Sequence, residues 1–307
     1  MRIVSLLASA TEIICSLGLR DNLVGVTHEC DYPADVVGLP IVTKSAIPHD
    51  AASIEIDRLV REQLEISTTL YSLNVELLDE LCPDLIVTQA LCEVCAVSES
   101  EIKDTICQLS AQPKLINLEP MCLEDVFNTL LLVGDVTKRT SIAENVVNSL
   151  KTRVGRVKAL TETHIKTDDY PKVAFLEWVD PPFNAGHWTP ELIEMAGGID
   201  CLGNKHRPSE KTLWDDVLEV QPEVMFIACC GFPVERAMND LPILQANEGW
   251  EDLPCVNNKR VYLSDGNSYF NRPGPRLVDS LEIIANALHP EVHILGIDLP
   301  SAIRVLD

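Results

Sequence analysis

The 307-residue sequence has few bases, no long apolar run and none of the commonest catalytic motifs. It carries 24 Lys+Arg against 47 Asp+Glu, a formal net charge of −23, and its bases form no cluster. A protein that follows a phosphate backbone needs such a cluster, so we expect no nucleic-acid partner. No apolar stretch approaches the ~20 residues that cross a bilayer, so we expect no transmembrane segment. The motifs GxxxxGK[ST], GxGxxG, GxSxG and HExxH are absent, which removes the commonest nucleotide-binding and hydrolase signatures.

Cysteine and the N-terminus bear on the compartment. Eleven cysteines are an odd number and too sparse for a disulfide scaffold, which favours reduced thiols and a cytoplasmic location. The apolar run 3–7 is too short for the core of a signal peptide. We interpret it as a buried strand followed by a helix. Ser9 and Glu12 have the spacing of a capping box, and Gly18 ends this helix.

Alternation of short apolar runs with amphipathic stretches predicts βαβ units and largely parallel sheets. With 46% hydrophobic and 23% charged residues the chain is globular. The expected strands are 3–7, 23–27, 85–88, 114–118, 173–177, 224–228 and 260–263. The expected helices include 75–81, 190–196, 214–220 and 275–288.

A long helix is expected in the middle of the chain. Apolar residues recur at Ile142, Val146, Leu150, Val154 and Val157, which keeps one helix face apolar. The fold class is therefore α/β, with two α/β lobes joined by one bridging helix. The expected division is an N-terminal lobe over 1–136, the bridging helix over 137–165 and a C-terminal lobe over 166–307.

The two lobes share a pattern. Residues 77–87 and 217–227 both show a helix end, a proline, an acidic residue and a buried strand. Cysteines follow each strand, namely Cys92 and Cys95 in the first lobe and Cys229 and Cys230 in the second. Ligands of open parallel sheets bind beyond the carboxyl ends of the strands. We therefore expect both cysteine groups to line a cleft between the lobes.

Aromatic residues gather where strands are expected to end. Seven of the Phe, Trp and Tyr residues fall within 175–188 and 262–270, and ligating groups concentrate in 27–33, 89–95 and 177–188. Aromatic walls with a few polar groups suit a large flat or apolar ligand. The predicted ligand-binding residues are His28, Tyr32, Glu177, Trp178, Phe183, His187, Trp188, Cys230, Phe232, Tyr269 and Arg272.

A metal site is one interpretation of the first-lobe cysteines. His28, Cys30, Cys92 and Cys95 supply four N/S ligands, the number that tetrahedral Zn²⁺ or Fe²⁺ takes. If the strands ending near Thr27 and Thr88 are parallel neighbours, all four side chains emerge at the same sheet edge. Two alternatives stay open: buried thiols that pack the strand ends, and a redox CxxC of the thioredoxin type.

Further polar groups have two interpretations each. His187 precedes an expected helix with Thr189 as N-cap and Pro190 at N1, so its imidazole either binds a metal or anion or packs in a loop. Arg272 or Arg276 either pairs with a ligand anion or ties its loop to Asp265. The other histidines, His49, His164, His206, His289 and His293, are expected at the surface.

The sequence resembles the cobalamin and ferric-siderophore branch of the periplasmic substrate-binding proteins, the helical-backbone metal receptor class. The resemblance covers nearly the whole chain. It is carried by residues 2–6, 10–12, 25–27, 31–33, 83–87, 181–183, 196–198, 266 and 272–279 and by the long middle helix. It implies two lobes, a shallow cleft, little hinge motion and ligand contacts around Tyr32, 178–183 and 269–272.

The sequence also departs from that family. It shows no export signal, and cysteines surround the expected cleft. It is most similar in this respect to a cytosolic offshoot described as cobalamin-binding, so we expect a cytoplasmic location and do not expect docking to a permease.

The leading hypothesis is a non-catalytic binder of cobalamin or a related corrinoid or metal chelate, with Zn or Fe as a further metal. One alternative is a metal- or thiol-dependent enzyme that reuses the cleft, with Glu29, Glu177 and Asp180 as acid/base groups. Another is an interaction module whose cleft is filled by its own side chains.

Overall fold

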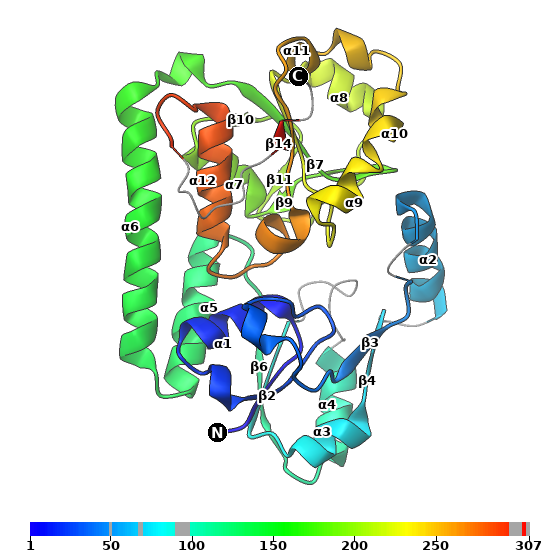
Figure 1. Ribbon diagram of the computed structural model, residues 1–307, viewed down its shortest axis with the longest axis vertical. Helices are drawn as coiled ribbons and strands as arrows, with labels where there is room; N and C mark the ends of the chain where they lie inside the picture. The colour runs from blue at the N-terminus through cyan, green and yellow to red at the C-terminus, as the bar shows by residue number, and fades with distance from the viewer. Residues whose placement is uncertain (49–50, 67–69, 90–98, 295–302, 305–307) are drawn as a thin grey trace. The chain divides into compact units, whose positions relative to one another are not determined.

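The computed structural model describes residues 1–48, 51–66, 70–89, 99–294 and 303–304 (Figure 1). The chain divides into two compact units. The first unit comprises Met1–Pro120 and Glu124–Asn148, and the second comprises Met121–Leu123 and Ser149–Asp307. Each unit is an α/β structure with its own largely parallel sheet, which confirms the expected two-lobe fold class.

The first unit is built on a four-stranded sheet of order β2-β1-β5-β6, in which all three pairings are parallel. Its strands are β1 (Ile3–Ser5), β2 (Leu23–Val26), β5 (Leu85–Thr88) and β6 (Lys114–Asn117), and β3 (Thr43–Ser45) and β4 (Tyr71–Leu73) form a separate antiparallel pair. Its helices are α1 (Ala8–Ser16), α2 (Ser53–Ile66), α3 (Val75–Leu81), α4 (Glu99–Gln108) and most of α5 (Leu123–Val136). Its core includes the fully buried Val4, Leu78 and Ile86, so sheet and helix pack directly against each other.

The second unit repeats this plan. Its main sheet has the order β10-β7-β12-β13-β14, with β8 added as the antiparallel partner of β7. The pairings among β10, β7, β12 and β13 are parallel, whereas β14 is antiparallel to β13. The strands are β7 (Lys172–Val179), β8 (Pro182–Asn184), β10 (Ile199–Asp200), β12 (Val224–Ile227), β13 (Val261–Leu263) and β14 (Ile303–Arg304), and β9 (Gly186–His187) pairs with β11 (Asn204–Lys205). The helices are α7 (Thr189–Met195), α8 (Trp214–Val220), α9 (Val234–Met238), α10 (Leu241–Gln245), α11 (Pro254–Asn257) and α12 (Leu277–Leu288).

The middle helix α6 (Thr140–His164) is continuous over 25 residues, as the apolar spacing predicts. Its buried side chains include Ala143, Val147, Leu150 and Val157. The boundary between the two units falls inside this helix, between residues 148 and 149. The separate assignment of 137–165 as a bridging segment stays a prediction.

The predicted elements match closely where a helix stop precedes a strand. Helices α3 and α8 and strand β5 have the expected bounds. The predicted capping box at Ser9 is wrong, because α1 begins at Ala8 with Leu7 as its N-cap and without a side-chain cap. The Ser9 hydroxyl lies inside the helix, buried and without a hydrogen-bond partner in the described part of the chain. Gly18 follows the helix with φ of 71°, as a helix end requires.

The internal repeat has a structural meaning. Cys82 and Gln221 end α3 and α8 with left-handed backbone, at φ of 43° and 50°. The acidic residue after each proline then binds the backbone at the start of the first parallel strand. Asp84 accepts from the Arg2 N–H at 2.7 Å, and Glu223 accepts from the Lys172 N–H at 2.9 Å.

Candidate functional site

Strands β7 and β12 of the second unit end side by side. They pair in parallel, and just after β12 the Cys230 N–H donates to the carbonyl of Glu177 in the last part of β7, at 3.0 Å. This arrangement brings residues 177–180 of one strand exit next to residues 228–232 of the other. The carboxyl edge of a parallel sheet is where open α/β folds bind ligands.

An aromatic pair and an arginine lie at this edge. The rings of Trp178 and Phe232 are 4.8 Å apart between centroids, tilted by 50°. Phe183 pairs with Trp178 in the β7–β8 hairpin. The Arg236 guanidinium carbon lies 4.4 Å above the Phe232 ring, and Arg236 also pairs with the buried Asp240 at 3.1 Å. We call Trp178, Phe183, Phe232 and Arg236 the aromatic–arginine group. It offers apolar area together with a fixed positive charge, which suits a flat ligand that carries an anionic group.

Arg236 was missed by the sequence analysis. Arg236 lies four residues after Phe232, but Pro233 lies between them and helix α9 does not begin until Val234. A helical i,i+4 spacing could not be inferred across that proline. Cys230, which was predicted to face ligand, is exposed, and its neighbour Cys229 is fully buried.

The side chain of Glu177 makes a hydrogen bond that holds two strands together at this edge. Its carboxylate accepts from the Gly186 N–H at 3.0 Å, which joins the end of β7 to the start of β9. Burial raises the pKa of Glu177 to about 7, although the Gly186 N–H opposes part of that increase. A carboxyl with this pKa exchanges a proton near neutral pH.

His187 adopts a left-handed backbone with φ of 52°, which is uncommon for a residue with a side chain. Burial lowers the pKa of its imidazole, and its Nε2 atom is buried with no hydrogen-bond partner among the described residues. A neutral imidazole with one uncommitted nitrogen can bind a metal or accept a hydrogen bond. The predicted cap is shifted by one residue: Trp188, and not Thr189, is the N-cap of α7.

Two other predicted residues serve the fold. Trp188 is 5% exposed, and its indole N–H donates to the Phe270 carbonyl at 2.8 Å. Arg272 is 6% exposed, and its guanidinium donates to the Asn267 side chain at 2.8 Å. Arg276 lies over the ring of Tyr269 with its guanidinium carbon 5.5 Å from the centroid. These arginines therefore make contacts inside their own loop.

Gly266 explains why this loop lies against the sheet. The π-helical turn η5 (Gly266–Phe270) begins at this glycine, and a Cβ there would come within 2.2 Å of the Cys229 carbonyl oxygen. Only glycine allows the turn to approach the exit of β12 so closely. The turn is closed by Asp265, whose side chain accepts from the Ser268 N–H at 2.7 Å.

Part of the aromatic density forms the core of the second unit. Phe175 stacks on Phe226 at 5.7 Å and contacts Phe270 at 5.1 Å, and all three side chains are almost fully buried. The Tyr262 ring also stacks on Phe226, with 5.4 Å between the ring centroids. Clustering of aromatics along the sequence therefore reported core packing as well as candidate ligand contacts.

In the first unit, His28 and Cys30 follow β2. The His28 Nδ1 atom is 2.7 Å from the Thr43 hydroxyl, and its Nε2 atom is 3.2 Å from a Glu29 carboxylate oxygen. The Cys30 sulfur is 3.0 Å from the Thr11 hydroxyl. Tyr32 is 47% exposed.

The premise of the four-ligand site is wrong in one respect. Strand β1 lies between β2 and β5, so the two strand ends are separated by two strand spacings of ~4.8 Å and are not neighbours. Cys92 and Cys95 lie outside the described residues. The metal ligation itself therefore stays a prediction.

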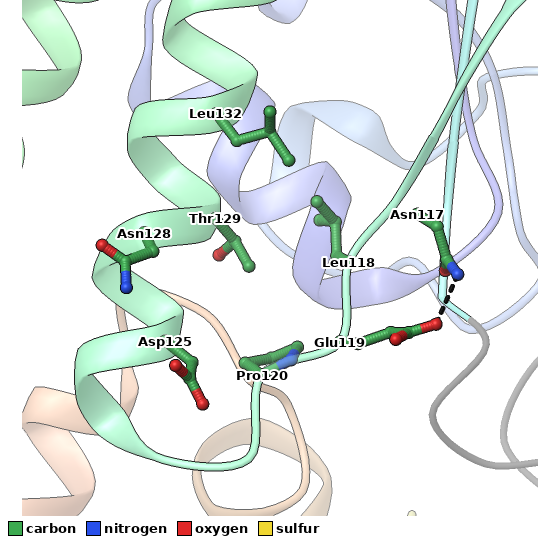
Figure 2. A pocket seen from close by; sticks show the side chains of 8 residues that line it. All are labelled: Asn117, Leu118, Glu119, Pro120, Asp125, Asn128, Thr129 and Leu132. Carbon is green, nitrogen blue, oxygen red and sulfur yellow. Dashed lines mark hydrogen bonds between the residues drawn. The ribbon is translucent and has the colours of Figure 1, made fainter.

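Figure 2 shows a different feature of the first unit, a pocket of about 360 Å³ between the exit of β6 and the first turns of α5. Asn117 donates to Glu119 at 2.5 Å on one side, and Asp125, Asn128 and Thr129 line the other. The lining holds no aromatic residue and no predicted ligand-binding residue. The sequence did not suggest it because its two walls come from separate elements.

The histidine assignments need one correction. His289 and His293 were expected at the surface, but they are 5% and 6% exposed. His289 Nε2 lies 2.9 Å from the Gly197 carbonyl, and His293 Nε2 lies 2.9 Å from the Thr161 hydroxyl. Both polar rings are buried because each has a hydrogen-bond partner within the second unit.

Comparison with known proteins identifies the family. The profile described as "Periplasmic binding protein" matches residues 3–267. The chain belongs to the periplasmic binding protein family. Its sequence identity to known members is low, but the similarity extends over nearly the whole chain. The vitamin B12-binding protein of Vibrio cholerae is 22% identical over 291 residues, covering 94% of this chain and 88% of that protein. An ABC transporter substrate-binding lipoprotein of Bacillus subtilis is 23% identical over 299 residues, covering 94% and 80%.

Solved structures of the periplasmic binding protein family share the fold. A periplasmic heme-binding protein from Pseudomonas aeruginosa superposes with a TM-score of 0.74 at 19% identity, covering 100% of this chain and 99% of that one. The periplasmic vitamin B12-binding protein of Vibrio cholerae superposes with a TM-score of 0.66 at 20% identity, covering 94% and 96%. At these identities the likeness establishes the two-lobe fold alone.

Family membership corrects the expected compartment. The cytoplasmic location is contradicted, because the family consists of periplasmic binding proteins and one relative is a lipoprotein of an ABC transporter. The expectation failed because an odd number of thiols limits how cysteines pair and does not fix where a protein works. The doubt about a permease partner rested on the same argument. Among the described residues, no helix combines the length and the apolar character that crossing a membrane requires.

Proposed function

We propose that this protein binds cobalamin or a related corrinoid or metal chelate without transforming it. The observation that carries the proposal is the match over 94% of the chain to proteins named for vitamin B12 binding. Structural neighbours that bind heme support a flat metal chelate as the ligand class. The binding residues in the second unit would be the aromatic–arginine group and His187, and His28 and Tyr32 remain the proposed residues of the first unit.

The chemistry of the aromatic–arginine group supports a macrocyclic ligand. Trp178 and Phe232 provide ring area, and Arg236 provides a charge that is already positioned by Asp240. The His187 Nε2 atom is a neutral nitrogen donor for a metal centre. Such a group binds through shape and dispersion, and it does not require a reactive side chain.

Three of the described thiols give no support to the enzyme alternative. Burial raises the pKa of Cys15 to about 11 and the pKa values of Cys229 and Cys255 to about 12. A nucleophilic cysteine needs a lowered pKa, because the thiolate is the reactive form. These three thiols therefore act as packing groups at neutral pH.

Two finer points belong to the proposal. Because a relative is a substrate-binding lipoprotein of an ABC transporter, the natural recipient of the ligand would be a membrane permease.

A further metal, Zn or Fe, would be held by His28, Cys30, Cys92 and Cys95. For that site we expect Cys92→Ser/Cys95→Ser to lose about one equivalent of metal from anaerobically purified protein. Equal metal content in variant and wild type would return these cysteines to a packing role.

The ligand proposal is tested by equilibrium dialysis with cobalamin, cobinamide and heme. We expect at least one of them to bind with a Kd below about 100 μM, which corresponds to roughly −5.5 kcal/mol. Failure of all three to reach this affinity would contradict the proposal.

A matched pair of tryptophan variants locates the site. Trp178→Ala removes the ring 4.8 Å from Phe232. Trp214→Ala removes the first side chain of α8, whose ring lies 6.0 Å from that of Trp250. Both indoles are partly buried and donate to a backbone carbonyl, at 3.1 and 3.0 Å. We expect Trp178→Ala to weaken ligand binding at least tenfold and Trp214→Ala to leave it unchanged. Equal effects would show that the strand-end edge is not the binding surface.

A further inference from the structure

Three side chains of different chemistry meet in the second unit, outside the aromatic–arginine group. They are Cys122, Glu191 and His206, and one ligand atom from each, the sulfur, a carboxylate oxygen and an imidazole nitrogen, lies within 4.8 Å of the other two. They come from three separate parts of the chain: the segment Met121–Leu123, the first turn of α7 and the residue after β11. We call them the Cys–Glu–His cluster.

The fold fixes the orientation of Glu191, which is 9% exposed. The Leu123 N–H donates to its Oε1 atom, so the backbone next to Cys122 holds one oxygen of the carboxylate. The other oxygen, Oε2, faces the His206 Nε2 atom at 3.2 Å. One oxygen is thus a positioning contact, and the other faces His206.

The backbone of His206 is also fixed by a hydrogen bond. Its backbone is left-handed, with φ of 60°, and its N–H donates to the His187 carbonyl at 2.8 Å. Its side chain is 47% exposed, so one side of the cluster is open to solvent. The hydrogen bond from the Leu123 N–H to Glu191 is of the kind that characteristically orients metal-binding carboxylates, and the backbone bond of His206 fixes the position of its main chain.

The distances suit a tetrahedral metal. Bonds of 2.0–2.2 Å from Zn²⁺ to nitrogen and oxygen place those two atoms about 3.3 to 3.6 Å apart, and a 2.3 Å bond to sulfur places it about 3.6 Å from each. The Glu191 Oε2 and His206 Nε2 atoms are 3.2 Å apart, and the Cys122 sulfur lies within 4.8 Å of a Glu191 carboxylate oxygen and of a His206 ring nitrogen. To complete three corners of the tetrahedron, the sulfur must approach the other two atoms by at most about 1.2 Å.

We propose that Cys122, Glu191 and His206 bind a divalent transition metal, with Zn²⁺ as the best match to one sulfur, one nitrogen and one oxygen donor. Because the His206 side chain is 47% exposed, we expect water to take the fourth position. The bound metal fastens the segment Met121–Leu123 to α7 and to the end of β11. This site is distinct from the four-ligand set expected in the first unit, and it does not depend on the chelate-binding proposal.

The test measures the binding of metal ions to the protein in the absence of any chelate ligand. Metal-free protein carrying Cys92→Ser/Cys95→Ser, which removes the other expected site, is titrated with Zn²⁺ and with Co²⁺. We expect one equivalent to bind, and the cobalt complex to show a sulfur-to-metal charge-transfer band. In this background, Cys122→Ser and His206→Gln should each weaken binding about 100-fold or more, and Cys122→Ser should abolish the charge-transfer band. Glu191 is left unchanged because its carboxylate also holds the Leu123 backbone.

Cys201→Ser is the matched control, because Cys201 is a partly buried thiol of the same unit whose sulfur donates to the Ile199 carbonyl. We expect it to bind metal like the parent. Thermal unfolding of each metal-free variant checks that the fold is intact. The proposal is overturned if Cys122→Ser binds Zn²⁺ as tightly as the parent, or if its cobalt band persists. It is also overturned if folded parent protein binds no metal, in which case Glu191 and His206 form only an ion pair.

Discussion

The carboxyl of Glu177 links a single residue to the pH dependence of stability. Its pKa rises from an ordinary 4.5 to about 7 on folding, chiefly through burial. Between these values the folded protein holds a proton that the unfolded chain releases. The contribution to stability is therefore fully present below pH 4.5 and is lost as the pH rises through 7.

Glu177→Gln keeps an oxygen for the Gly186 N–H and removes the titration. We expect the free energy of unfolding of wild type minus that of the variant to fall between pH 4.5 and 7, by at most about 3 kcal/mol. Urea unfolding at a series of pH values measures it. Parallel curves for the two proteins would show that Glu177 titrates alike in both states.

Gly266 carries a second prediction at the level of one residue. In Gly266→Ala the new Cβ meets backbone atoms of residues 228 and 229 at 2.2 to 2.8 Å, and neither segment can move without disturbing β12. We expect destabilisation of about 2 kcal/mol. Gly155→Ala in α6 is the control, because no atom lies within 4 Å of its new Cβ. It should stabilise the protein by up to about 1 kcal/mol, since alanine favours helix. Similar losses in both variants would refute the steric argument.

The same kind of contact occurs inside each unit. An acidic side chain accepts a hydrogen bond from the backbone N–H at the start of a strand. Asp84→Ala and Glu223→Ala remove the acceptors for Arg2 and Lys172. Because both carboxylates are exposed, we expect each loss to cost only about 1 kcal/mol of unfolding free energy and to speed amide exchange at Arg2 or Lys172. Glu219→Ala, on the exposed face of α8, should change stability by less than about 0.5 kcal/mol. Unchanged exchange at both amides would contradict this role.

The same elements show what the sequence could predict. Helices α3 and α8 and the strands after them were predictable because a proline and an apolar run mark the change from one element to the next. The start of α1 was not, because Ser9 fits a cap by spacing but is buried one residue inside the helix. Burial of His289 and His293 depends on the Gly197 carbonyl and the Thr161 hydroxyl, which are distant in sequence.

The candidate site was predictable only in part for a similar reason. Trp178 and Phe232 could be placed at strand exits from local pattern, and they do meet. Arg236 and the Cys–Glu–His cluster depend on how loops return to the sheet, which no local spacing specifies. Strand order is equally nonlocal, and the insertion of β1 between β2 and β5 invalidated the expected contact between their ends.

The whole molecule carries a net charge of −23, which favours solubility and opposes compactness through self-repulsion. Raising NaCl from 10 to 150 mM shortens the reach of these charges to about 8 Å. We therefore expect stability to increase by on the order of 1 kcal/mol, or about 2 °C in Tm. Thermal unfolding at the two salt concentrations tests this. A lower Tm at 150 mM would mean that favourable ion pairs outweigh the repulsion.

The order of strands along the chain has a consequence for biosynthesis. All four strands of the first unit's parallel sheet lie before residue 118, whereas β7, the first strand of the second sheet, begins at Lys172. At ribosomal rates of about 5–20 residues per second, the intervening residues take roughly 3 to 11 s to synthesise. The first sheet can therefore close during translation, before any strand of the second sheet exists to compete for its edges. We therefore expect the order of synthesis to keep the two sheets, which share a strand order, from exchanging strands.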